Sequence, residues 1–450
     1  MRILFTTFEG GGHVPPALVM AAALRRRGHD VLVISDEANR IDAEAMGLRF
    51  GAWVRAPNRK AKGAADDPLQ DWRRRWPPAI VKSVVRSVLC GPAAAYAADT
   101  RDRIEAFRPD LIITNELLLG VMVAAERAAV PVAALTANVW CFPTRSDVPP
   151  FGPGWAPARS PHETRRDAVA RRWIAAWYDA GLGDLNAARA SLGLPPLART
   201  LDQLATLERV VLGTSAAFDF GASPAPPPFV HAGRLLPEPD LRLAPHVRDW
   251  IDRGGPQVLV SFSTTYQGQA PVLSRCIRAL ERLGVRALVT TGPAVDVTSL
   301  PRAPNVLAVS HASHDALMGR MDLMISHGGH GTVIRALAAG TPVLCLPMGR
   351  DHPDNARRIV ERGAGLTLSR GASSAAIARA ASRLLGEERY AAGARRLARA
   401  LAVDPSSRDR ALDALEALDA LEALAGRVAA EWPHPDRGRE GPGPSLDAAA

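Results

Sequence analysis

Strand-like runs alternate with helical runs twice along this chain, and the alternation limits the folds open to it. In residues 1–140 the stretches RILFTTF, DVLVISD, DLIITNE and VPVAALT are separated by helical segments. The rhythm restarts with QVLVSFS, VRALVTTG, NVLAVS, DLMISHGG and TPVLCLPMG. Such a pattern predicts parallel sheets with crossover helices. We expect an α/β protein with two Rossmann-like, doubly wound domains facing across a cleft.

The domain boundaries follow from length and from one Pro-rich stretch. A chain of 450 residues suits two domains of roughly 200 residues each. The segment TSAAFDFGASPAPPPFVHAGRLLPEPD has no periodicity, which is typical of a linker. The predicted divisions are an N-terminal domain over 1–213, a linker over 214–245, a C-terminal domain with terminal helices over 246–432 and a disordered tail over 433–450.

Composition favours a soluble globular protein. Hydrophobic residues make up 47% of the chain, and no run approaches the roughly 18 to 20 apolar residues of a membrane span. The start, MRILFTTFEGGGHV, is interpreted as a first strand rather than a signal peptide. Four widely spaced cysteines predict free thiols and a cytoplasmic location.

The net charge of +9 is not a signal for nucleic-acid binding in this chain, because the arginines are scattered over helices such as ALRRRGH and no nucleic-acid motif occurs. The repetitive stretch RALDALEALDALEALAGRVAAEW has helical leucine spacing. It fits either an amphipathic surface helix or a helix that binds a partner.

A glycine-rich loop in DLMISHGGHGTVIRALAAG predicts an anion site. The strand ends at Ser326 and a helix is expected to begin near Thr332, so backbone N–H groups lie at a helix N-terminus. A plain strand–helix turn fits the spacing equally well. The candidate donors are the side chains of His327 and Thr332 and the backbone of Gly328, Gly329 and Gly331.

A polar cluster follows the next strand, in LPMGRDHPDNARRIVERGAGL. Asp351 and His352 are therefore expected at the same carboxyl edge of the sheet, where they can hydrogen-bond hydroxyl groups of a ligand. Asn355 fits an ordinary cap or first-turn residue as well. The loop and the cluster together point to one ligand gripped at two ends.

These segments resemble the donor signature of the nucleotide-sugar-dependent family 1 glycosyltransferases, most closely their bacterial natural-product branch, which includes macrolide and antibiotic glycosyltransferases. The resemblance rests on HGGHGT at 327–332, Ala-Leu-x-x-Gly-x-Pro through Pro342, Pro347 to Asp351, and Asp-Asn-Ala at 354–356. It implies a GT-B fold, with the acceptor in the N-terminal domain and a UDP- or dTDP-sugar in the C-terminal domain. The glycine loop is then expected to hold the diphosphate, and Asp351 and His352 the sugar.

Two further segments carry the resemblance to the nucleotide. HASHDALM at 311–318 matches a base-stacking stretch, which implies stacking by His311 and backbone contacts from Ala312. SFSTTYQGQ resembles the segment whose hydroxyls approach the phosphates, which implicates Ser263 and Thr264. Asp351-His352 stands where the family often has Asp-Gln, and Arg335 where many members carry an acidic ribose-reading residue. The sugar, and the choice between uridine and deoxythymidine, stay open.

His13 is the candidate catalytic base. It lies in EGGGHVPP, after the first strand and just before a helix that Pro15 or Pro16 is expected to begin. The positive helix end disfavours imidazolium, so the ring can take a proton near pH 7. A structural histidine fits the local sequence too. Gly-His-Val-x-Pro resembles the family's base loop, which implies deprotonation of an acceptor hydroxyl and inversion at the anomeric carbon.

The residue that orients His13 stays open between two neighbours. The family's usual aspartate falls in PDLIITNELL, where this chain has Asn115 followed by Glu116. Asn115 can orient the ring without charge, whereas Glu116 can help only if its side chain turns inward. No Asp-x-Asp or metal-ligand spacing occurs, so no metal or other cofactor is expected. Leaving-group charge would fall to His327, the loop amides and the helix dipole.

Aromatic residues outside the regular pattern predict a large apolar acceptor pocket for a hydrophobic small molecule. The candidates are Trp72, Trp76, Trp140, Phe142 and Trp155. A lipid-linked cell-envelope glycosyltransferase stays open because IVKSVVRSVLCG offers an apolar, basic patch. A noncatalytic nucleotide-sugar-binding partner fits the missing aspartate at position 115. A nicotinamide oxidoreductase would need a third glycine that EGGGHVPP lacks. Monomer and homodimer both fit.

Overall fold

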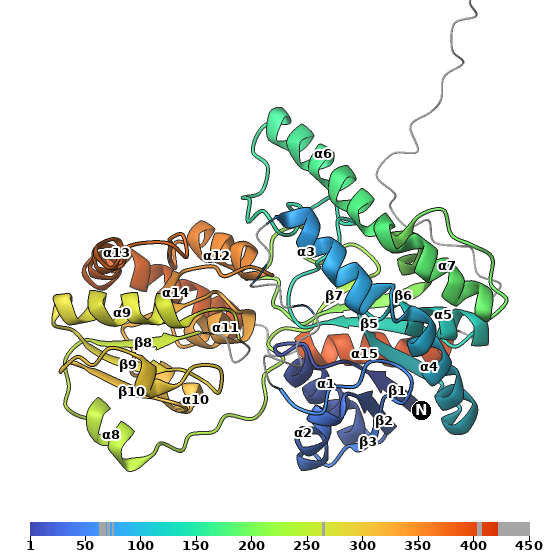
Figure 1. Cartoon of the computed structure of the whole chain (residues 1–450), viewed down its shortest axis with the longest axis horizontal. Helices are drawn as coiled ribbons and strands as arrows, with labels where there is room; N and C mark the ends of the chain where they lie inside the picture. The colour runs from blue at the N-terminus through green and yellow to red at the C-terminus, as the bar shows by residue number, and fades with distance from the viewer. Residues whose placement is uncertain (63–68, 70–72, 74–75, 263–265, 403–406, 422–450) are drawn as a thin grey trace, which may run out of the picture.

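The computed structural model describes residues 1–62, 69, 73, 76–262, 266–402 and 407–421. These residues form two α/β units, each built on a parallel sheet with flanking helices, and the predicted architecture is confirmed (Figure 1). Trp72, Ser263, Thr264 and the predicted tail over 433–450 lie outside the described residues.

The first unit contains a seven-stranded sheet in the order β3-β2-β1-β4-β5-β6-β7. Its central strands β4 and β5 are buried along their whole length, as expected for strands covered on both faces. The strands are β1 (Arg2–Thr6), β2 (Asp30–Ser35), β3 (Arg49–Ala52), β4 (Leu111–Asn115), β5 (Val132–Thr136), β6 (Leu207–Leu212) and β7 (Phe229–His231). The helices are α1 (Val14–Arg26), α2 (Arg40–Ala45), α3 (Pro77–Val84), α4 (Ala93–Phe107), α5 (Leu119–Ala128), α6 (Pro161–Tyr178) and α7 (Leu182–Ser191), with a π-helical turn η3 (Val85–Leu89) after α3.

The second unit contains a six-stranded sheet in the order β10-β9-β8-β11-β12-β13. Its strands are β8 (Gln257–Ser261), β9 (Arg286–Thr290), β10 (Val306–Val309), β11 (Leu323–Ser326), β12 (Val343–Cys345) and β13 (Gly365–Thr367). The helices after the first sheet are α8 (Pro245–Ile251), α9 (Ala270–Leu283), α10 (His314–Met318), α11 (His330–Ala338), α12 (His352–Glu361), α13 (Ser374–Gly386), α14 (Glu388–Ala402) and α15 (Ser407–Leu421).

Two elements cross the predicted domain boundaries. β7 lies inside the predicted linker, yet it pairs with β6 as the edge strand of the first sheet. Prolines on its N-terminal side hid this short apolar strand in the sequence. The chain also returns at its end, because α15 packs against the first domain rather than the second (Figure 1).

The contacts of α15 explain its leucine spacing. Ala411, Leu415 and Leu418 recur at helical spacing, and all three are buried in the core cluster that contains β1 and α1. Arg27 Nη1 donates to Asp413 Oδ1 at 2.6 Å and to Glu416 Oε2 at 2.8 Å on the outer edge of this contact. Of the two sequence interpretations, the helix is an amphipathic one whose apolar stripe is covered by the chain's own first domain.

A buried ionic cluster around Asp219 joins the two domains. Asp219 Oδ1 accepts from Arg358 Nη2 of α12 at 2.7 Å, and its Oδ2 lies 3.2 Å from both Arg145 Nη1 and His231 Nε2. Burial raises the pKa of Asp219, but Arg358, His231 and Arg145 more than offset this and hold the pKa below its usual range. An ionised carboxylate therefore ties α12 to the first domain.

Candidate active site

His13 occupies the start of α1, in the loop that follows β1. It is the N-cap residue, with Pro15 and Pro16 in the first turn, and its ring stacks against Phe8 at a centroid distance of 5.6 Å. About a quarter of the side chain is exposed. Burial lowers the pKa of His13 to about 4, and Asp351 and Arg350 of the second domain act on it in opposite directions. The ring is therefore neutral at pH 7 and faces the second domain.

Both candidate partners of His13 approach its Nδ1. Asn115 Nδ2 lies 3.3 Å away and Glu116 Oε1 lies 3.9 Å away. They reach the same ring because β4 ends at Asn115, so the alternation of a strand no longer separates their side chains. Asn115 Oδ1 accepts from Leu117 N at 3.0 Å, which leaves its amide nitrogen facing His13.

Glu116 is an unusual buried carboxyl group. Only 1% of the residue is exposed, and its Oε2 has no hydrogen-bond partner among the described residues. Burial raises the pKa of Glu116 to about 8, so the group is largely protonated at neutral pH. The arrangement places a second proton-carrying group beside the candidate base.

The glycine loop joins β11 to α11, and the helix begins at His330, two residues before the predicted start. Gly328 has a φ of 96°, and a Cβ there would lie 3.1 Å from the carbonyl oxygen of His352, so glycine is required. Gly331 and Thr332 lie half-buried in the first turn. This geometry presents backbone amides at the N-terminus of a nine-residue helix.

His327 and His352 lie deeper than the sequence predicted. The His327 ring sits under the loop, 2.4 Å from where a Cβ of Gly329 would be, and 4.4 Å from the His352 ring. His352 is 3% exposed, and its Nδ1 accepts from Met348 N at 3.3 Å. Burial lowers the pKa of His352 to about 3. The first turn of α12 directs this side chain against His327, and the sugar contact of His352 stays a prediction.

Asp351 is the more accessible member of the polar cluster, and it is connected to both domains. As the N-cap residue of α12 it accepts from Asn138 Nδ2 of the first domain at 2.9 Å and from Asn355 Nδ2 at 2.7 Å. Asn355 also donates to the carbonyl oxygen of Gly328 at 2.9 Å. Asn355 is thus more than a first-turn residue, since it ties the glycine loop to the polar cluster.

The predicted nucleobase segment begins at His311, two residues after β10 ends at Val309. His311 is exposed, whereas the side chain of Ala312 is buried in the core and leaves only its backbone to a ligand. Ser313 caps α10 through a hydrogen bond from Ala316 N at 3.4 Å. Arg335 is bound to Asp315, with Nε 2.9 Å from Oδ1.

The aromatic candidates do not form one pocket. Trp140 and Phe142 are buried in the first-domain core, where their rings pack edge-on at 5.1 Å, and their contact with an acceptor stays a prediction. Trp155 is half-buried beneath the guanidinium of Arg166 at 4.1 Å. Trp76 is 70% exposed at the start of α3. Composition could not distinguish core from surface in this irregular segment.

A strap from the first domain, residues 150–159, lies over α12. Gly152 N donates to Asp354 Oδ2 at 2.9 Å, Arg357 Nε donates to the carbonyl oxygen of Gly154 at 3.1 Å, and Arg159 pairs with Glu361. With the Asn138–Asp351 hydrogen bond, these contacts hold loops of the first domain against the helix that bears the polar cluster. The Gly-Pro-Gly sequence at 152–154 was the available sequence signal for this strap.

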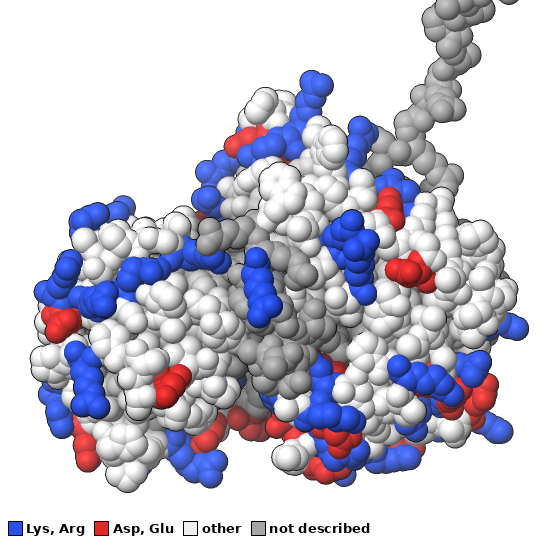
Figure 2. Space-filling view, in the orientation of Figure 1, with Lys and Arg blue, Asp and Glu red and all other residues white. Residues whose placement is uncertain are grey.

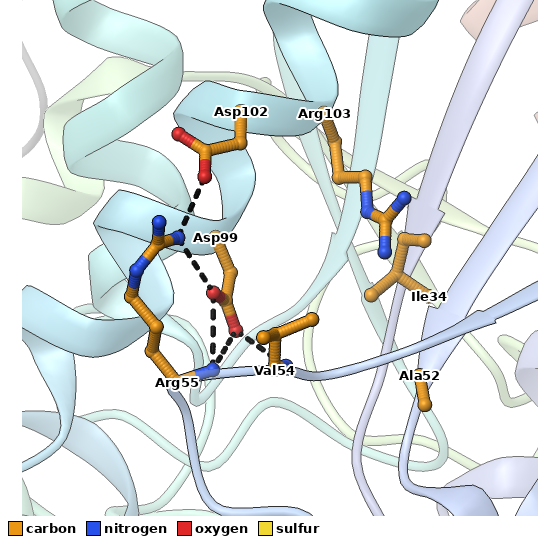
Figure 3. Close-up of a pocket in the computed structure, with 7 residues that line it drawn as sticks. All are labelled: Ile34, Ala52, Val54, Arg55, Asp99, Asp102 and Arg103. Atoms are coloured by element: carbon orange, nitrogen blue, oxygen red, sulfur yellow. Dashed lines mark hydrogen bonds and ion pairs between the residues drawn. The ribbon is translucent and has the colours of Figure 1, made fainter.

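A separate pocket of about 230 Å³ opens between the β2–β3 edge and α4 (Figure 3). Arg55 Nη1 contacts Asp99 Oδ1 at 3.2 Å and Asp102 Oδ2 at 2.6 Å there. The pocket is lined by Ile34, Ala52, Val54, Arg55, Asp99, Asp102 and Arg103. None of the predicted site residues belongs to it.

Among the residues that the structure describes, no helix is long and apolar enough to cross a membrane. In the same part of the chain, no group of three or more His, Cys, Asp or Glu side chains could hold a metal ion.

Comparison with known proteins identifies relatives of this chain. Residues 280–418 match the family model described as erythromycin biosynthesis protein CIII-like, C-terminal domain. The 4'-demethylrebeccamycin synthase of Lentzea aerocolonigenes is 28% identical over 427 residues, which cover 92% of this chain and 98% of that protein. The O-mycaminosyltylonolide 6-deoxyallosyltransferase of Streptomyces fradiae is 26% identical over 381 residues, covering 81% and 84% respectively.

Solved structures share the fold at lower identity. The kitacinnamycin glycotransferase has a TM-score of 0.70 at 18% identity, over 93% of this chain and 98% of that one. VinC in complex with dTDP has a TM-score of 0.65 at 18% identity, over 92% and 99%. The spinosyn rhamnosyltransferase SpnG complexed with spinosyn aglycone has a TM-score of 0.64 at 19% identity, over 94% and 100%.

The two facing parallel-sheet domains and these likenesses define the chain as a glycosyltransferase of the GT-B fold. Its sequence relatives are natural-product glycosyltransferases of the antibiotic-biosynthesis type, as the resemblance in its donor segment implied.

Proposed function

We propose that this protein transfers a hexose or deoxyhexose from a UDP- or dTDP-sugar to a hydroxyl of a hydrophobic natural product, with inversion at the anomeric carbon. The observation that carries the proposal is the approach of Asp351 to His13 across the domain boundary. Asn138 of the first domain donates to Asp351 at 2.9 Å, and the charge of Asp351 raises the pKa of His13 against the larger effect of burial. The dTDP complex of VinC and the aglycone complex of SpnG favour a deoxythymidine donor and a lipophilic acceptor.

In this proposal His13 Nε2 accepts the proton of the acceptor hydroxyl. The hydroxyl oxygen then bonds to the anomeric carbon from the face opposite the nucleotide, while the bond from that carbon to the diphosphate oxygen breaks. Charge developing on the diphosphate is stabilised by the amides of the glycine loop and the N-terminus of α11. We propose that no metal or further cofactor takes part.

The tautomer that His13 needs as a base distinguishes the roles of Asn115 and Glu116. For Nε2 to accept a proton, Nδ1 must carry one and needs an acceptor for it. Asn115 presents its amide nitrogen, which favours the opposite tautomer, whereas Glu116 presents a carboxyl oxygen at 3.9 Å. We assign Glu116 the part of positioning residue, acting in its ionised form after a small approach to Nδ1.

The pH dependence tests this assignment. Because Glu116 ionises only near pH 8, kcat/KM is expected to rise as the pH approaches 8. Glu116→Gln keeps the side-chain shape but removes the carboxylate, so kcat/KM should fall by about 10- to 100-fold and its alkaline rise should disappear. A pH–rate profile of both proteins, with acceptor at a fixed concentration, measures this.

Stability gives a second readout for the same variant. The pKa of Glu116 is higher in the folded protein than in the unfolded chain. Its contribution to stability is therefore fully present below the ordinary pKa of 4.5, and it is lost as the pH rises through about 8. Wild type should therefore lose stability over that window, and Glu116→Gln should lose less. An unchanged pH–rate profile in Glu116→Gln would remove Glu116 from the mechanism.

The donor side is tested through Asp351. Asp351→Asn removes the charge that we propose to bind a sugar hydroxyl, and the KM for the donor should rise by about tenfold, since a hydrogen bond to a charged group contributes about 1.5–3 kcal/mol. Asp252→Asn, in an exposed pair with Arg320, is the matched control and should leave the donor KM unchanged. Initial rates at varied donor concentration and saturating acceptor measure these KM values. Equal KM values for Asp351→Asn and wild type would refute the proposed contact between Asp351 and a sugar hydroxyl.

The stereochemistry of the product tests the proposal as a whole. An α-linked sugar nucleotide should give a β-linked glycoside, identified from the anomeric proton coupling in NMR spectra of the purified product. An α-linked product would contradict the inverting mechanism while leaving glycosyl transfer intact.

A further inference from the structure

The surface formed by α3 and α6 exposes aromatic and aliphatic side chains. The apolar residues of helix α3, in PPAIVKSV, are at most partly buried, and Val81 and Val84 pack against the first-domain core. It packs beside α6, and Trp76 at its N-terminus is 70% exposed (Figure 1). On α6, Trp173 is 64% exposed and Val169 is 45% exposed. Val169 and Trp173 are four residues apart and share one face of the helix.

Cationic side chains surround these apolar ones. Lys82 on α3 and Arg165 on α6 are exposed, as is Arg86 on the π-helical turn after α3. The acidic residues of α6 are engaged locally: Asp167 is buried beside Arg166, and Glu163 accepts from Arg159 N at 2.6 Å. Lys and Arg side chains accordingly stand out over these helices in the space-filling view (Figure 2).

We propose that this surface, defined by Trp76, Lys82, Arg165, Val169 and Trp173 and called here the docking face, binds the surface of an anionic lipid bilayer. Tryptophan is the side chain best suited to the headgroup level, where its apolar body and polar N–H are both satisfied. Lysine and arginine beside it are attracted by anionic headgroups. A helix with apolar and cationic residues on one face therefore lies on a bilayer without crossing it.

The combination of positive charge and apolar surface on the docking face identifies an anionic lipid bilayer as its partner. Scattered exposed apolar side chains are normal on soluble proteins, but two exposed tryptophans on adjoining helices within a cationic surround are complementary to an anionic bilayer. Its use rests on the proposed function: a lipophilic acceptor partitions into membranes, so docking would hold the acceptor domain where the acceptor accumulates. Binding itself does not depend on that function.

Co-sedimentation of the full chain with vesicles tests the proposal. Vesicles of phosphatidylglycerol and phosphatidylcholine should retain the protein, vesicles of phosphatidylcholine alone should retain far less, and added salt should release it. The double variant Trp173→Ser/Arg165→Glu should bind the anionic vesicles about tenfold more weakly. Leu241→Ser/Arg242→Glu, a matched pair of exposed residues just before α8, should bind as wild type does.

Several outcomes would overturn the proposal: no retention of wild type on anionic vesicles, retention that ignores lipid charge, or equal binding by the two double variants. Thermal unfolding of each variant establishes that the fold is intact. Transfer to a hydrophobic acceptor, assayed without vesicles, separates this proposal from the proposed function. Vesicle binding without transfer would refute the function and leave the docking face standing, and transfer without vesicle binding would do the reverse.

Discussion

His13→Gln is expected to lower kcat/KM by about 10²- to 10⁴-fold, the range that general base catalysis contributes. The ring is neutral because burial lowers its pKa to about 4, so the base is available across the neutral range and its removal leaves only water to accept the proton. The Kd for the nucleotide-sugar should stay near the wild-type value, because His13 belongs to the first domain. Initial rates together with calorimetric donor titration separate the two effects.

His246→Gln is the matched control, since His246 is exposed on α8 and away from both sheet edges of the cleft. It should retain wild-type kcat/KM. If His13→Gln were as active as this control, the base would have to be another residue. If His13→Gln lost donor binding as well, the histidine would be serving the donor rather than the acceptor.

Asp219→Ala is expected to lower the free energy of unfolding by about 3–5 kcal/mol, because it leaves buried cations without their counter-charge. Arg358 and Arg145 both direct guanidinium groups at this carboxylate, and neither can deprotonate to escape the cost. Since Asp219 connects α12 to the first domain, the loss should fall on the transition that separates the domains. Urea unfolding, followed by far-UV circular dichroism and by tryptophan fluorescence, measures it.

Asp240→Ala provides the comparison, because Asp240 pairs with Arg242 at the exposed surface and such pairs contribute little. Its unfolding midpoint should match wild type. Equal midpoints for Asp219→Ala and Asp240→Ala would mean that the buried cluster does not stabilise the domain arrangement.

The sequence was sufficient to predict the two sheets and the loops that bring the candidate site residues to one sheet edge. Glycine loops after apolar strands, and a proline pair after His13, are local signals whose geometry depends on a few neighbouring residues. Gly328 illustrates this, because its positive φ and its approach to the His352 carbonyl need glycine whatever the rest of the chain does.

Other features depended on contacts between distant segments, which local patterns do not contain. The leucine spacing predicted a helix at α15 but not its return to the first domain. There Asp413 contacts Arg27, a residue 386 positions earlier in the chain. Trp140 and Phe142 fitted an open pocket and a core equally well until their neighbours were known. The approach of Glu116 to His13 depended on where β4 ends, and a shift of one residue would have turned it away.

Mass-spectrometric detection of product, from a pool of UDP- and dTDP-sugars with a panel of phenolic and macrocyclic acceptors, tests the central claim most directly. The proposed function predicts that wild type adds one hexose or deoxyhexose to a hydrophobic acceptor, and that His13→Gln does not under the same conditions. If donors bind but no acceptor gains mass, glycosyl transfer to a hydrophobic small molecule is contradicted, and a noncatalytic nucleotide-sugar-binding protein, consistent with Asn115 in place of an aspartate, becomes the better account.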